Sequence, residues 1–570
     1  MSPLIHGDRR LDLTAGKSLF DYADTLSVRV PTSCGRTGEC HECIVEVKQG
    51  MRALSPLTEA ESFLRGNYRL ACQAKVLDPG ADIQFNVLRR QPRILTKGVR
   101  REVELSPLTV QRDGGVWFEG NGGHRRLDDY HGAIYGLAVD AGTTTVVMNL
   151  VDLEKGGVVC TASFENPQRF GGSDIMHRIS YDGGKFHGEL QAVLLSSINF
   201  EIGDMCRRLK IRRRHIYEMV VAGNATMRDL FFGLDVQPIG LKPYKSTTED
   251  AFRRGERSTT ALNVKAGDLG VRIHPLANVY GGPLIASHVG ADTAADIAAL
   301  GLEEATEPFI LVDVGTNTEV VVGTKDRMLA ASCPAGPAFE GGEVKYGMPG
   351  YDGAIEKVRI ADGRAEYETI GGKPPEGICG SGLVDLLAEL RRTGVMNELG
   401  AFVLPSPSEG RGTRASGSQG VGKGPSPRME EFVVDPLRGI TISRRDISAL
   451  AQAKAANFCG QSILTRKYGL PQEKFSKLYL AGGFANYIDV KNAVDIGFIA
   501  NVPLDRIVKV GNASLEGATV MLLSGPKRRE IEEFVKTIEH VELETTPDFF
   551  DFFVEGCQFK PMALPAPMPG

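Results

Sequence analysis

The spacing of apolar and polar residues changes character along the chain. In residues 4–13 the two kinds alternate, which predicts a strand, and residues 18–26 carry apolar positions at helical spacing, which predicts a short amphipathic helix. Three further short strands are expected in the same region, at residues 44–47, 74–76 and 82–87. The pattern therefore predicts a small α+β domain over residues 1–88.

Longer apolar strands alternate with helical stretches from about residue 133 to 565, which is typical of layered α/β architecture. Residues 405–428 interrupt the pattern with Gly, Ser and Pro, and we expect a disordered surface insertion there. Residues 89–132 form a basic linker and a short connecting unit. The large domain is predicted to have two lobes, at about 133–305 and 306–565.

Composition excludes several classes of function. The chain has 570 residues, of which 42% are apolar and 24% charged, with a net charge of −5. This balance favours neither nucleic acid nor membrane as a partner. Without a signal-like N-terminus or an apolar run of spanning length, a cytoplasmic protein is expected. Ten cysteines are too few for a disulfide scaffold in a chain of this length.

Four of the cysteines form a pattern of their own. Cys34, Cys40 and Cys43 lie in one loop as C-x5-C-x2-C, and Cys72 follows after 28 residues. Three thiolates in one loop and a fourth from farther along the chain are typical ligands of a [2Fe–2S] cluster. A structural zinc ion is the alternative, but zinc sites usually consist of two CxxC-like pairs, whereas Cys34 and Cys72 stand alone. With four thiolates available, His41 is expected to be an exposed loop residue and not a ligand.

Two segments 173 positions apart share a second pattern. Each begins with Asp at the end of an apolar strand and continues through Gly and hydroxyl residues: Asp140-Ala-Gly142-Thr143-Thr144-Thr145 and Asp313-Val-Gly315-Thr316-Asn317-Thr318. Glycine lets backbone N–H groups approach phosphate oxygens, and hydroxyls donate further hydrogen bonds. The carboxylates would repel a polyphosphate unless Mg²⁺ lies between them. The pair therefore predicts a nucleotide site.

A third strand, at residues 477–481, ends in Gly482 and Gly483, which leave room for a ribose and an α-phosphate. No GxxxxGK[ST] loop occurs in the sequence. The alternative interpretation is that all three motifs are ordinary turns of a doubly wound sheet and bind no ligand. Two Asp-x-Gly-Thr turns followed by a strand with two glycines, in this order, favour the nucleotide site.

These motifs carry two resemblances. Residues 1–88, with Arg69-Leu-Ala-Cys72-Gln, resemble a plant- or adrenodoxin-type ferredoxin of the β-grasp fold. Residues 133–565 resemble the two-lobed actin/Hsp70/hexokinase (ASKHA) ATPases. The second resemblance implies that Asp140 and Asp313 are catalytic and organise Mg²⁺ and the attacking water. It also implies that Gly142, Thr143, Thr144, Thr145, Gly315, Thr316 and Asn317 hold phosphates, and that Gly482 and Gly483 admit the nucleoside.

The combination of a ferredoxin and an ASKHA ATPase resembles the reductive activators of corrinoid proteins. Further strings fit that family: Gly223-Asn-Ala-Thr-Met227, Gly290-Ala-Asp292-Thr293, Ala335-Gly-Pro-Ala-Phe-Glu340-Gly, Cys379-Gly-Ser-Gly382-Leu and Gly511-Asn-Ala-Ser-Leu-Glu516-Gly-Ala. The resemblance implies ATP-dependent reduction of an inactive Co(II) corrinoid to Co(I) in a methyltransferase system. The implied partners are a corrinoid protein and an upstream reductase or electron carrier, and a homodimer is a candidate assembly.

The resemblance has physical content and two departures. Plant-type clusters lie near about −400 mV, a Co(II) corrinoid is generally harder to reduce, and each 100 mV uphill costs about 2.3 kcal/mol. ATP binding or hydrolysis is expected to open and close the cleft between the lobes and so to remodel how the corrinoid is held. Residues 332–340 are a candidate segment for facing the corrinoid, through Ser332 or Cys333, and a buried structural turn is the alternative. The departures are Thr318, where Gly is expected, and a middle region shortened to about 35 residues.

Three other functions fit part of the sequence. An ATP-driven electron donor to a different low-potential enzyme keeps both halves, although such activators usually bind a [4Fe–4S] cluster between subunits. The second is a non-enzymatic Hsp70- or actin-like binding module whose nucleotide controls assembly, although no substrate-binding β-domain of the chaperone kind is expected after the ATPase. The third is a sugar or acetate kinase, which leaves the ferredoxin unexplained. The basic residues of the linker, which are Arg89, Arg90, Arg93, Lys97, Arg100 and Arg101, form either a solvated connector or a strip for an acidic partner.

Overall fold

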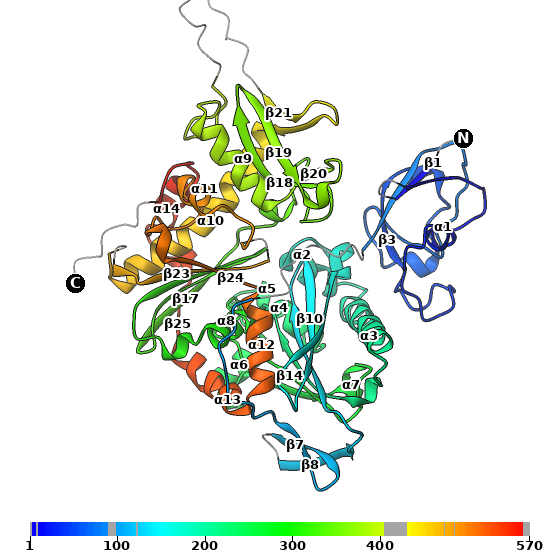
Figure 1. Ribbon diagram of the computed structural model, residues 1–570, viewed down its shortest axis with the longest axis vertical. Coiled ribbons are helices and arrows are strands. Elements are labelled where there is room, and N and C mark those ends of the chain that lie inside the picture. Colours follow the sequence, from blue (N-terminus) through cyan, green and yellow to red (C-terminus); the bar gives the residue numbers. More distant parts are fainter. Residues whose placement is uncertain are drawn as a thin grey trace, which may run out of the picture. The chain divides into compact units, whose positions relative to one another are not determined.

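A computed structural model describes residues 3–6, 9–88, 98–120, 123–403, 430–471, 474–483 and 485–562. The expected insertion at 405–428 and the linker residues 89–97 lie outside these ranges. Two compact units make up the chain: residues 1–305 with 512–540, and residues 306–511 with 541–570. Figure 1 shows the elements of both, and each unit is described by itself.

The first unit begins with a mixed five-stranded sheet in the order β2-β1-β5-β3-β4. Its elements are β1 (Pro3–His6), β2 (Arg9–Asp12), α1 (Leu19–Thr25), β3 (Ile44–Gln49), β4 (Tyr68–Leu70) and β5 (Ile83–Val87), with short 3₁₀ turns η1 (Met51–Ala53) and η2 (Glu59–Glu61). Strand β1 is antiparallel to β2 and parallel to β5. This confirms the β-grasp ferredoxin fold.

The local sequence explains most of these elements. Ser18 caps α1 in a capping box with Asp21, and the apolar residues of the helix are buried. Residues 4–13 form two strands instead of one. Residues 74–76 do not form a strand, because Lys75 and Val76 make only isolated bridges, to Ser18 and Leu54.

A three-stranded antiparallel sheet follows in the connecting unit. It consists of β6 (Thr109–Arg112), β7 (Gly115–Gly120) and β8 (Gly123–Asp129). The only tryptophan, Trp117, lies in β7 and donates its indole N–H to the carbonyl of Arg112 at 3.1 Å. The hydrogen bond closes the turn between the first two strands.

The first lobe is built on a six-stranded sheet in the order β11-β10-β9-β12-β14-β13. The strands are β9 (Tyr135–Ala141), β10 (Thr145–Asp152), β11 (Val158–Glu165), β12 (Ile216–Ala222), β13 (Leu262–Lys265) and β14 (Asn278–Gly281). The helices are α2 (Ile175–Asp182), α3 (Glu189–Leu209), α4 (Ala225–Phe231), α5 (Gln237–Gly240), α6 (Thr247–Arg253), α7 (Ala266–Leu269) and α8 (Ala291–Leu300), with η3 (Pro167–Gly171), η4 (Arg213–His215) and η5 (Leu302–Glu304).

The main sheet of the second unit has the order β24-β23-β15-β16-β17. Its strands are β15 (Phe309–Val314), β16 (Thr318–Thr324), β17 (Arg327–Cys333), β23 (Lys477–Ala481) and β24 (Ile507–Gly511). Smaller sheets contain β18 (Ala354–Ala361), β19 (Arg364–Thr369) and β20 (Gly377–Ile378), and β21 (Glu431–Asp435) with β22 (Ile440–Ser443). The helices are α9 (Gly380–Arg392), α10 (Arg444–Tyr468), α11 (Val490–Asp495) and α14 (Phe549–Gly556), with η6 (Ala338–Glu340), η7 (Ile370–Gly372), η9 (Leu504–Arg506) and η11 (Leu543–Thr545).

The two large sheets share one topology. In each, a strand that ends in Asp-x-Gly pairs antiparallel with the next strand, which pairs antiparallel with a third. On its other edge the same strand is followed by two parallel strands, β12 and β14 in the first unit and β23 and β24 in the second. The repeated motif therefore marks a repeated fold, and the two-lobed ASKHA architecture is confirmed.

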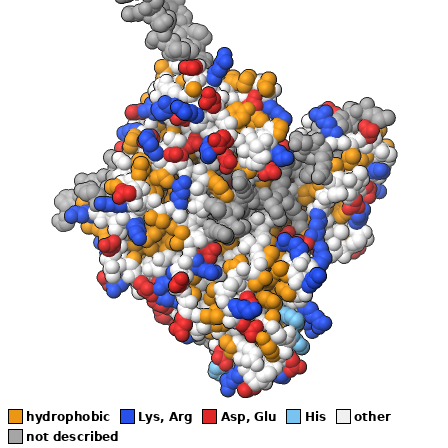
Figure 2. Space-filling model, viewed as in Figure 1, with side chains coloured by type: hydrophobic (Ala, Val, Ile, Leu, Met, Phe, Trp, Pro, Cys, Tyr) orange, Lys and Arg blue, Asp and Glu red, His pale blue; other side chains and the backbone are white. Residues whose placement is uncertain are grey.

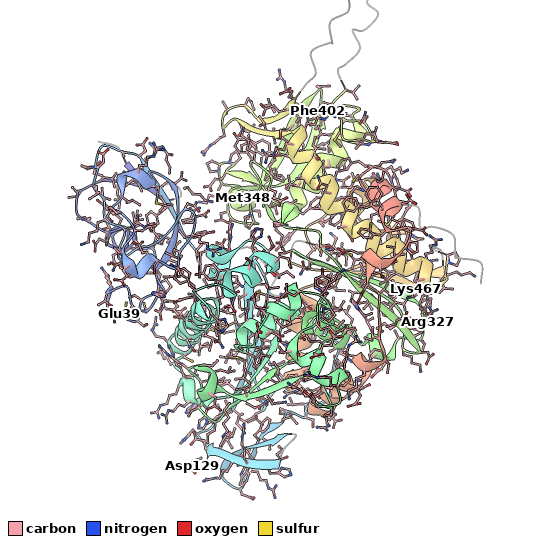
Figure 3. All side chains as sticks on the ribbon, turned by 180° about the vertical axis from the view of Figure 1, so that it is seen from behind. Glu39, Asp129, Arg327, Met348, Phe402 and Lys467 are labelled. Atoms are coloured by element: carbon pink, nitrogen blue, oxygen red, sulfur yellow. The ribbon has the colours of Figure 1, made fainter. Side chains whose placement is uncertain are left out.

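In the second unit, a side chain of the main sheet is hydrogen bonded to the C-terminal turn of helix α10. Arg327, at the start of β17, donates to the carbonyl of Lys467 in the last turn of α10 at 3.1 Å, and Figure 3 shows the two labelled residues on neighbouring elements.

Acidic and basic side chains are interspersed on the face in Figure 2, in keeping with the small net charge. None of the helices in the described ranges is long and apolar enough to cross a bilayer.

One segment departs from the predicted lobes. Residues 512–540, expected in the second lobe, pack in the first unit, where α12 (Ala513–Leu523) and α13 (Gly525–Phe534) are followed by η10 (Val535–Thr537) and β25 (Glu539–His540). The orange helix α12 lies among the cyan and green elements in Figure 1. Its residues Ala513–Leu523 are buried throughout, and a Cβ on Gly517 would lie 1.7 Å from the carbonyl oxygen of Ala295 in α8. Only glycine permits this close helix crossing.

We expect Gly517→Ala to destabilise the first unit. Alanine normally favours a helix over glycine, but here its methyl group would push two helices apart, at a cost of about 3 kcal/mol. The apparent melting temperature should fall by about 6 °C or more. Gly157→Ala is the control, because a Cβ there meets nothing within 4 Å. An unchanged melting temperature for Gly517→Ala would contradict the packing described.

Candidate functional site

The first Asp-x-Gly-Thr motif forms a tight turn between β9 and β10. A Cβ on Gly142 would lie 2.5 Å from the carbonyl oxygen of Thr145, so the turn closes only around glycine. Asn166 braces it from η3: its side-chain amide donates to the carbonyl of Gly142 at 2.8 Å, and its backbone N–H donates to the carbonyl of Thr144 at 2.8 Å. The turn is therefore fixed before any ligand binds.

Asp140 is the second-last residue of β9, two positions before the glycine of the motif. Residues from near the C-terminal end of the chain hold its carboxylate. Asn512 donates its side-chain N–H to one carboxylate oxygen at 2.8 Å, and the hydroxyl of Ser514 donates to the other at 3.2 Å. Burial raises the pKa of Asp140 to about 6, although these two hydrogen bonds oppose the rise. The carboxylate is fixed in position and costly to ionise without a nearby cation.

Thr143 lies at the centre of the turn and is buried. Its hydroxyl accepts a hydrogen bond from the side-chain amide of Asn224 at 3.0 Å, and its carbonyl accepts one from Arg178 at 2.6 Å. Asn224 caps α4, where its side chain accepts the N–H of Met227 at 2.9 Å. Three separate elements thus converge on the first motif.

The second motif lies in the second unit, at the end of β15. The N–H of Gly315 donates to the carbonyl of Asn317 at 3.1 Å and closes the turn. The hydroxyl of Thr316 donates to the carboxylate of Glu340 in η6. Thr318 is the first residue of β16 and is buried opposite Cys333, so the unexpected Thr is accommodated in the sheet.

The glycine pair lies beside this turn. Asp313 of β15 pairs in register with Ala481 of β23, so Gly482 follows at the same sheet edge. Gly482 has φ +108°, and a Cβ there would lie 2.2 Å from the carbonyl of Val314, whereas a Cβ on Gly483 would meet nothing within 4 Å. Gly482 is thus required by the chain itself, and Gly483 leaves open space.

The residues expected to face a corrinoid have different surroundings. Cys333 is fully buried in β17, and burial raises its pKa well above the ordinary value. The Cys333 thiol is therefore not at the surface, which favours the structural alternative for this residue, and a role of the other residues of 332–340 beside the corrinoid stays a prediction. Ser332 is half-buried and donates its hydroxyl to Glu319 at 3.0 Å.

The four cysteines of the N-terminal domain form two pairs. Cys43 and Cys72 are buried with their sulfurs 3.4 Å apart, and Cys34 and Cys40 are hydrogen bonded to each other. A single zinc ion would bring all four sulfurs within about 3.8 Å of one another. In the described part of the chain, no three of them lie within 4.8 Å of one another. Two pairs fit two irons with two thiolates each, and the residues therefore fit a [2Fe–2S] cluster.

Hydrogen bonds and burial shift the pKa values of three of these thiols in different directions. Burial raises the pKa of Cys34, but hydrogen bonds from Thr37 and from Cys40 outweigh it and lower this pKa to about 5. The hydrogen bond from Cys43 lowers the pKa of Cys72 to about 7 against the effect of burial. The same bond, together with burial, raises the pKa of Cys43. A metal that replaces the shared proton would relieve this opposition.

A buried ion pair positions the strand that leads to Cys72. Arg69 donates two hydrogen bonds to the carboxylate of Glu61, at 2.7 and 3.1 Å, and both side chains are almost fully buried. Glu61 also accepts the backbone N–H of Leu70 at 3.0 Å. Within the string Arg69-Leu-Ala-Cys72, Arg69 therefore has a structural role, because its ion pair with Glu61 fixes the strand that precedes the cysteine. By contrast, Glu39 in the cluster loop is exposed, as the labelled residue in Figure 3 shows.

Sequence reasoning named the strings that contain Asn224, Glu340, Asn512 and Ser514 but gave none of them a role at the site. Asn166 was not singled out at all. Their signal in the sequence is weak, because each reaches the motif through the fold and not through spacing along the chain. His41 was expected to be exposed, but it is half-buried.

Comparisons with known proteins agree with this geometry. Residues 5–77 match the model of a 2Fe-2S iron-sulfur cluster binding domain, residues 135–305 match the RACo middle region, and residues 307–568 match the C-terminal domain of RACo, the ASKHA domain. The chain is 28% identical to the corrinoid activation enzyme RamQ of Eubacterium limosum, over 97% of this chain and 98% of the relative. It is 22% identical to the [Co(II) methylated amine-specific corrinoid protein] reductase of Methanosarcina barkeri, over 76% and 78% of the two chains.

A solved structure titled reductive activator for corrinoid, iron-sulfur protein has 28% identity and a TM-score of 0.69, and the match covers 99% of both chains. The middle-region match corrects one expectation. Residues 135–305, which contain the first Asp-x-Gly-Thr motif, match the RACo middle region, so the chain has a middle region beyond the short segment that precedes Gly136.

The raised pKa of Asp140 makes a prediction about stability. Between the ordinary value of 3.8 and about 6 the folded state holds a proton that the unfolded state releases, so stability falls as the pH rises through this window. In EDTA, Asp140→Asn should melt about 3 °C higher than wild type at pH 7.5, and the difference should vanish near pH 4.

Ser514→Ala removes one hydrogen bond to the carboxylate and should steepen the loss of stability with pH. Melting curves of the three proteins across the pH range measure both effects. A difference between wild type and Asp140→Asn that is constant with pH would show that the carboxylate does not titrate in this window.

Proposed function

Because the chain belongs to the RACo family, we propose that it is an ATP-hydrolysing reductive activator of a corrinoid protein. It reduces inactive Co(II) corrinoid to Co(I) and so returns the partner to methyl transfer. The single observation that carries this proposal is the presence, in one chain, of a two-pair cysteine site for a cluster and of two phosphate turns on repeated sheets. Neither half alone requires the other.

ATP is the nucleotide in this proposal, and the two turns bind its phosphates. Asp140 and Asp313 organise Mg²⁺ and the attacking water, with Asp140 oriented by Asn512 and Ser514. Burial raises the pKa of Asp140, and a bound Mg²⁺ would lower it again by favouring the ionised carboxylate. Backbone N–H groups and hydroxyls of the other motif residues bind phosphate oxygens, and these residues are Gly142, Thr143, Thr144, Thr145, Gly315, Thr316 and Asn317.

Cys34, Cys40, Cys43 and Cys72 hold the [2Fe–2S] cluster. When bound, the cluster accepts and delivers one electron at a time. The electron comes from an upstream reductase or reduced carrier, and one electron converts Co(II) to Co(I). Hydrolysis of ATP by water to ADP and phosphate drives the conformational work on the partner.

The test of this function uses a purified Co(II) corrinoid protein, a low-potential reductant and ATP. Wild type should form Co(I), and Cys43→Ser should reduce the rate at least a hundredfold, because one iron loses a ligand. Asp313→Asn should cause a loss of about 10²–10³-fold, since it removes a charge that organises the metal and water. Co(I) formation at the wild-type rate by either variant, followed spectroscopically, would refute the proposal.

Gly483→Val tests where the nucleoside binds. Because a Cβ at this position meets no atom of the described residues within 4 Å, apart from its chain neighbours, the variant should fold. The added side chain would occupy space needed by the ribose, and affinity for ATP should fall at least tenfold, as measured by calorimetry. Gly157→Ala serves as a glycine control outside the site. Unchanged ATP affinity in Gly483→Val would place the nucleoside elsewhere.

A further inference from the structure

Helix α2 carries two fully buried side chains that contact two different parts of the first unit. Arg178 and Tyr181 both have no exposed surface and lie three residues apart, which is about 4.5 Å along a helix. Arg178 reaches the first phosphate turn, and Tyr181 reaches the cluster domain. A single short helix therefore contacts both the nucleotide motif and the iron–sulfur domain.

The Tyr181 side of the helix meets the cluster domain in an aromatic contact. Its hydroxyl donates to the backbone carbonyl of Phe63 at 2.6 Å. The ring of Phe170 lies edge-on to both Tyr181 and Phe63, with centroids 5.5 and 5.3 Å away. The guanidinium of Arg65 lies 4.6 Å from the Tyr181 ring centroid. These residues belong to one buried cluster or lie on its surface.

His41 connects this contact to the cluster loop. It follows Cys40 directly and stacks on Phe63 with ring centroids 4.0 Å apart. Its Nδ1 lies 3.0 Å from a carboxylate oxygen of Glu189, the first residue of α3. Movement of the cluster domain away from the first lobe would break together the contacts that His41, Phe63 and Arg65 make with that lobe. We call them the dock, and its residues are His41, Phe63, Arg65, Phe170, Tyr181 and Glu189.

The Arg178 side of the helix holds the phosphate turn. One guanidinium nitrogen donates to the carbonyl of Thr143 at 2.6 Å, and the others donate to the carbonyl of Gly172 at 3.1 Å and to the side-chain carbonyl of Gln168 at 3.1 Å. Gln168 in turn donates to the carbonyl of Leu190 in α3 at 2.9 Å. Displacement of α2 would therefore change the position of the turn.

We propose that α2 couples ATP binding at the first phosphate turn to the dock, so that ATP tightens the hold on the cluster domain and the docked domain tightens ATP binding. Tyr181 is a positioning residue that acts through Arg178. The inference rests on the proposed function, because it assigns ATP to this turn. In this coupling, the dock keeps the cluster loop in one orientation while ATP is bound.

The sign of the coupling follows from ordering. Docking immobilises α2 and with it the carbonyl of Thr143, so the turn that ATP meets has already lost its conformational freedom. A ligand that binds an ordered site does not have to supply that ordering free energy. By linkage, ATP must strengthen the dock by the same factor as the dock strengthens ATP binding.

Tyr181→Phe tests the coupling in the full-length holoprotein. The variant keeps the ring but removes the hydroxyl that donates to Phe63. Calorimetry should show that a non-hydrolysable ATP analogue binds about fivefold more weakly than to wild type. Hydrogen exchange of residues 39–46 should be faster in the variant, and the analogue should slow it in wild type but much less in the variant.

Two further variants complete the experiment. Glu189→Gln weakens the other end of the dock and should change both readouts in the same direction. Tyr22→Phe removes a tyrosine hydroxyl that hydrogen bonds to Thr14 within the cluster domain, away from the dock, and should leave ATP affinity unchanged.

The outcomes separate the two proposals. Faster exchange in Tyr181→Phe with analogue affinity within about twofold of wild type would overturn the coupling, and so would exchange that does not change. Absence of analogue binding by wild type would instead refute the proposed function.

Discussion

The hydrogen bonds that Asn512 and Ser514 donate to Asp140 are the interaction on which the first lobe depends. They join positions 372 and 374 residues apart in the sequence. To make them, the chain must return from the second unit and bury α12 against α8 and β9. The close crossing at Gly517 is the steric requirement of that return. A fixed carboxylate at the end of β9 is the result.

The fold could be predicted from the sequence wherever a local pattern determines it. The capped helix at Ser18, the strand at residues 477–481 and the repeated strand–turn motifs all needed only periodicity and turn chemistry. The return of residues 512–540 could not be predicted, because a helix that is buried on all sides, as α12 is, has no polar face to indicate which core it packs against. The bracing of the turn by Asn166 was equally hidden, since an asparagine after a strand is ordinary in any loop.

The cysteine site shows the same division. Spacing was enough to choose iron over zinc, and the two sulfur pairs agree with it. Spacing could not show that His41 reaches a carboxylate of the first lobe, because Glu189 lies 148 residues farther along the chain. Such contacts depend on how domains pack, which no local pattern encodes. In the proposed coupling, these contacts connect the cluster site to the nucleotide site.

In the proposed function, ATP controls when an electron reaches cobalt. A single-turnover reaction measures this control: wild-type protein with its cluster already reduced is mixed with a Co(II) corrinoid protein, with ATP, with ADP or with no nucleotide. We expect Co(I) to accumulate with ATP, and one cluster to be oxidised for each Co(I) formed. Equal rates of Co(I) formation in all three mixtures would contradict it.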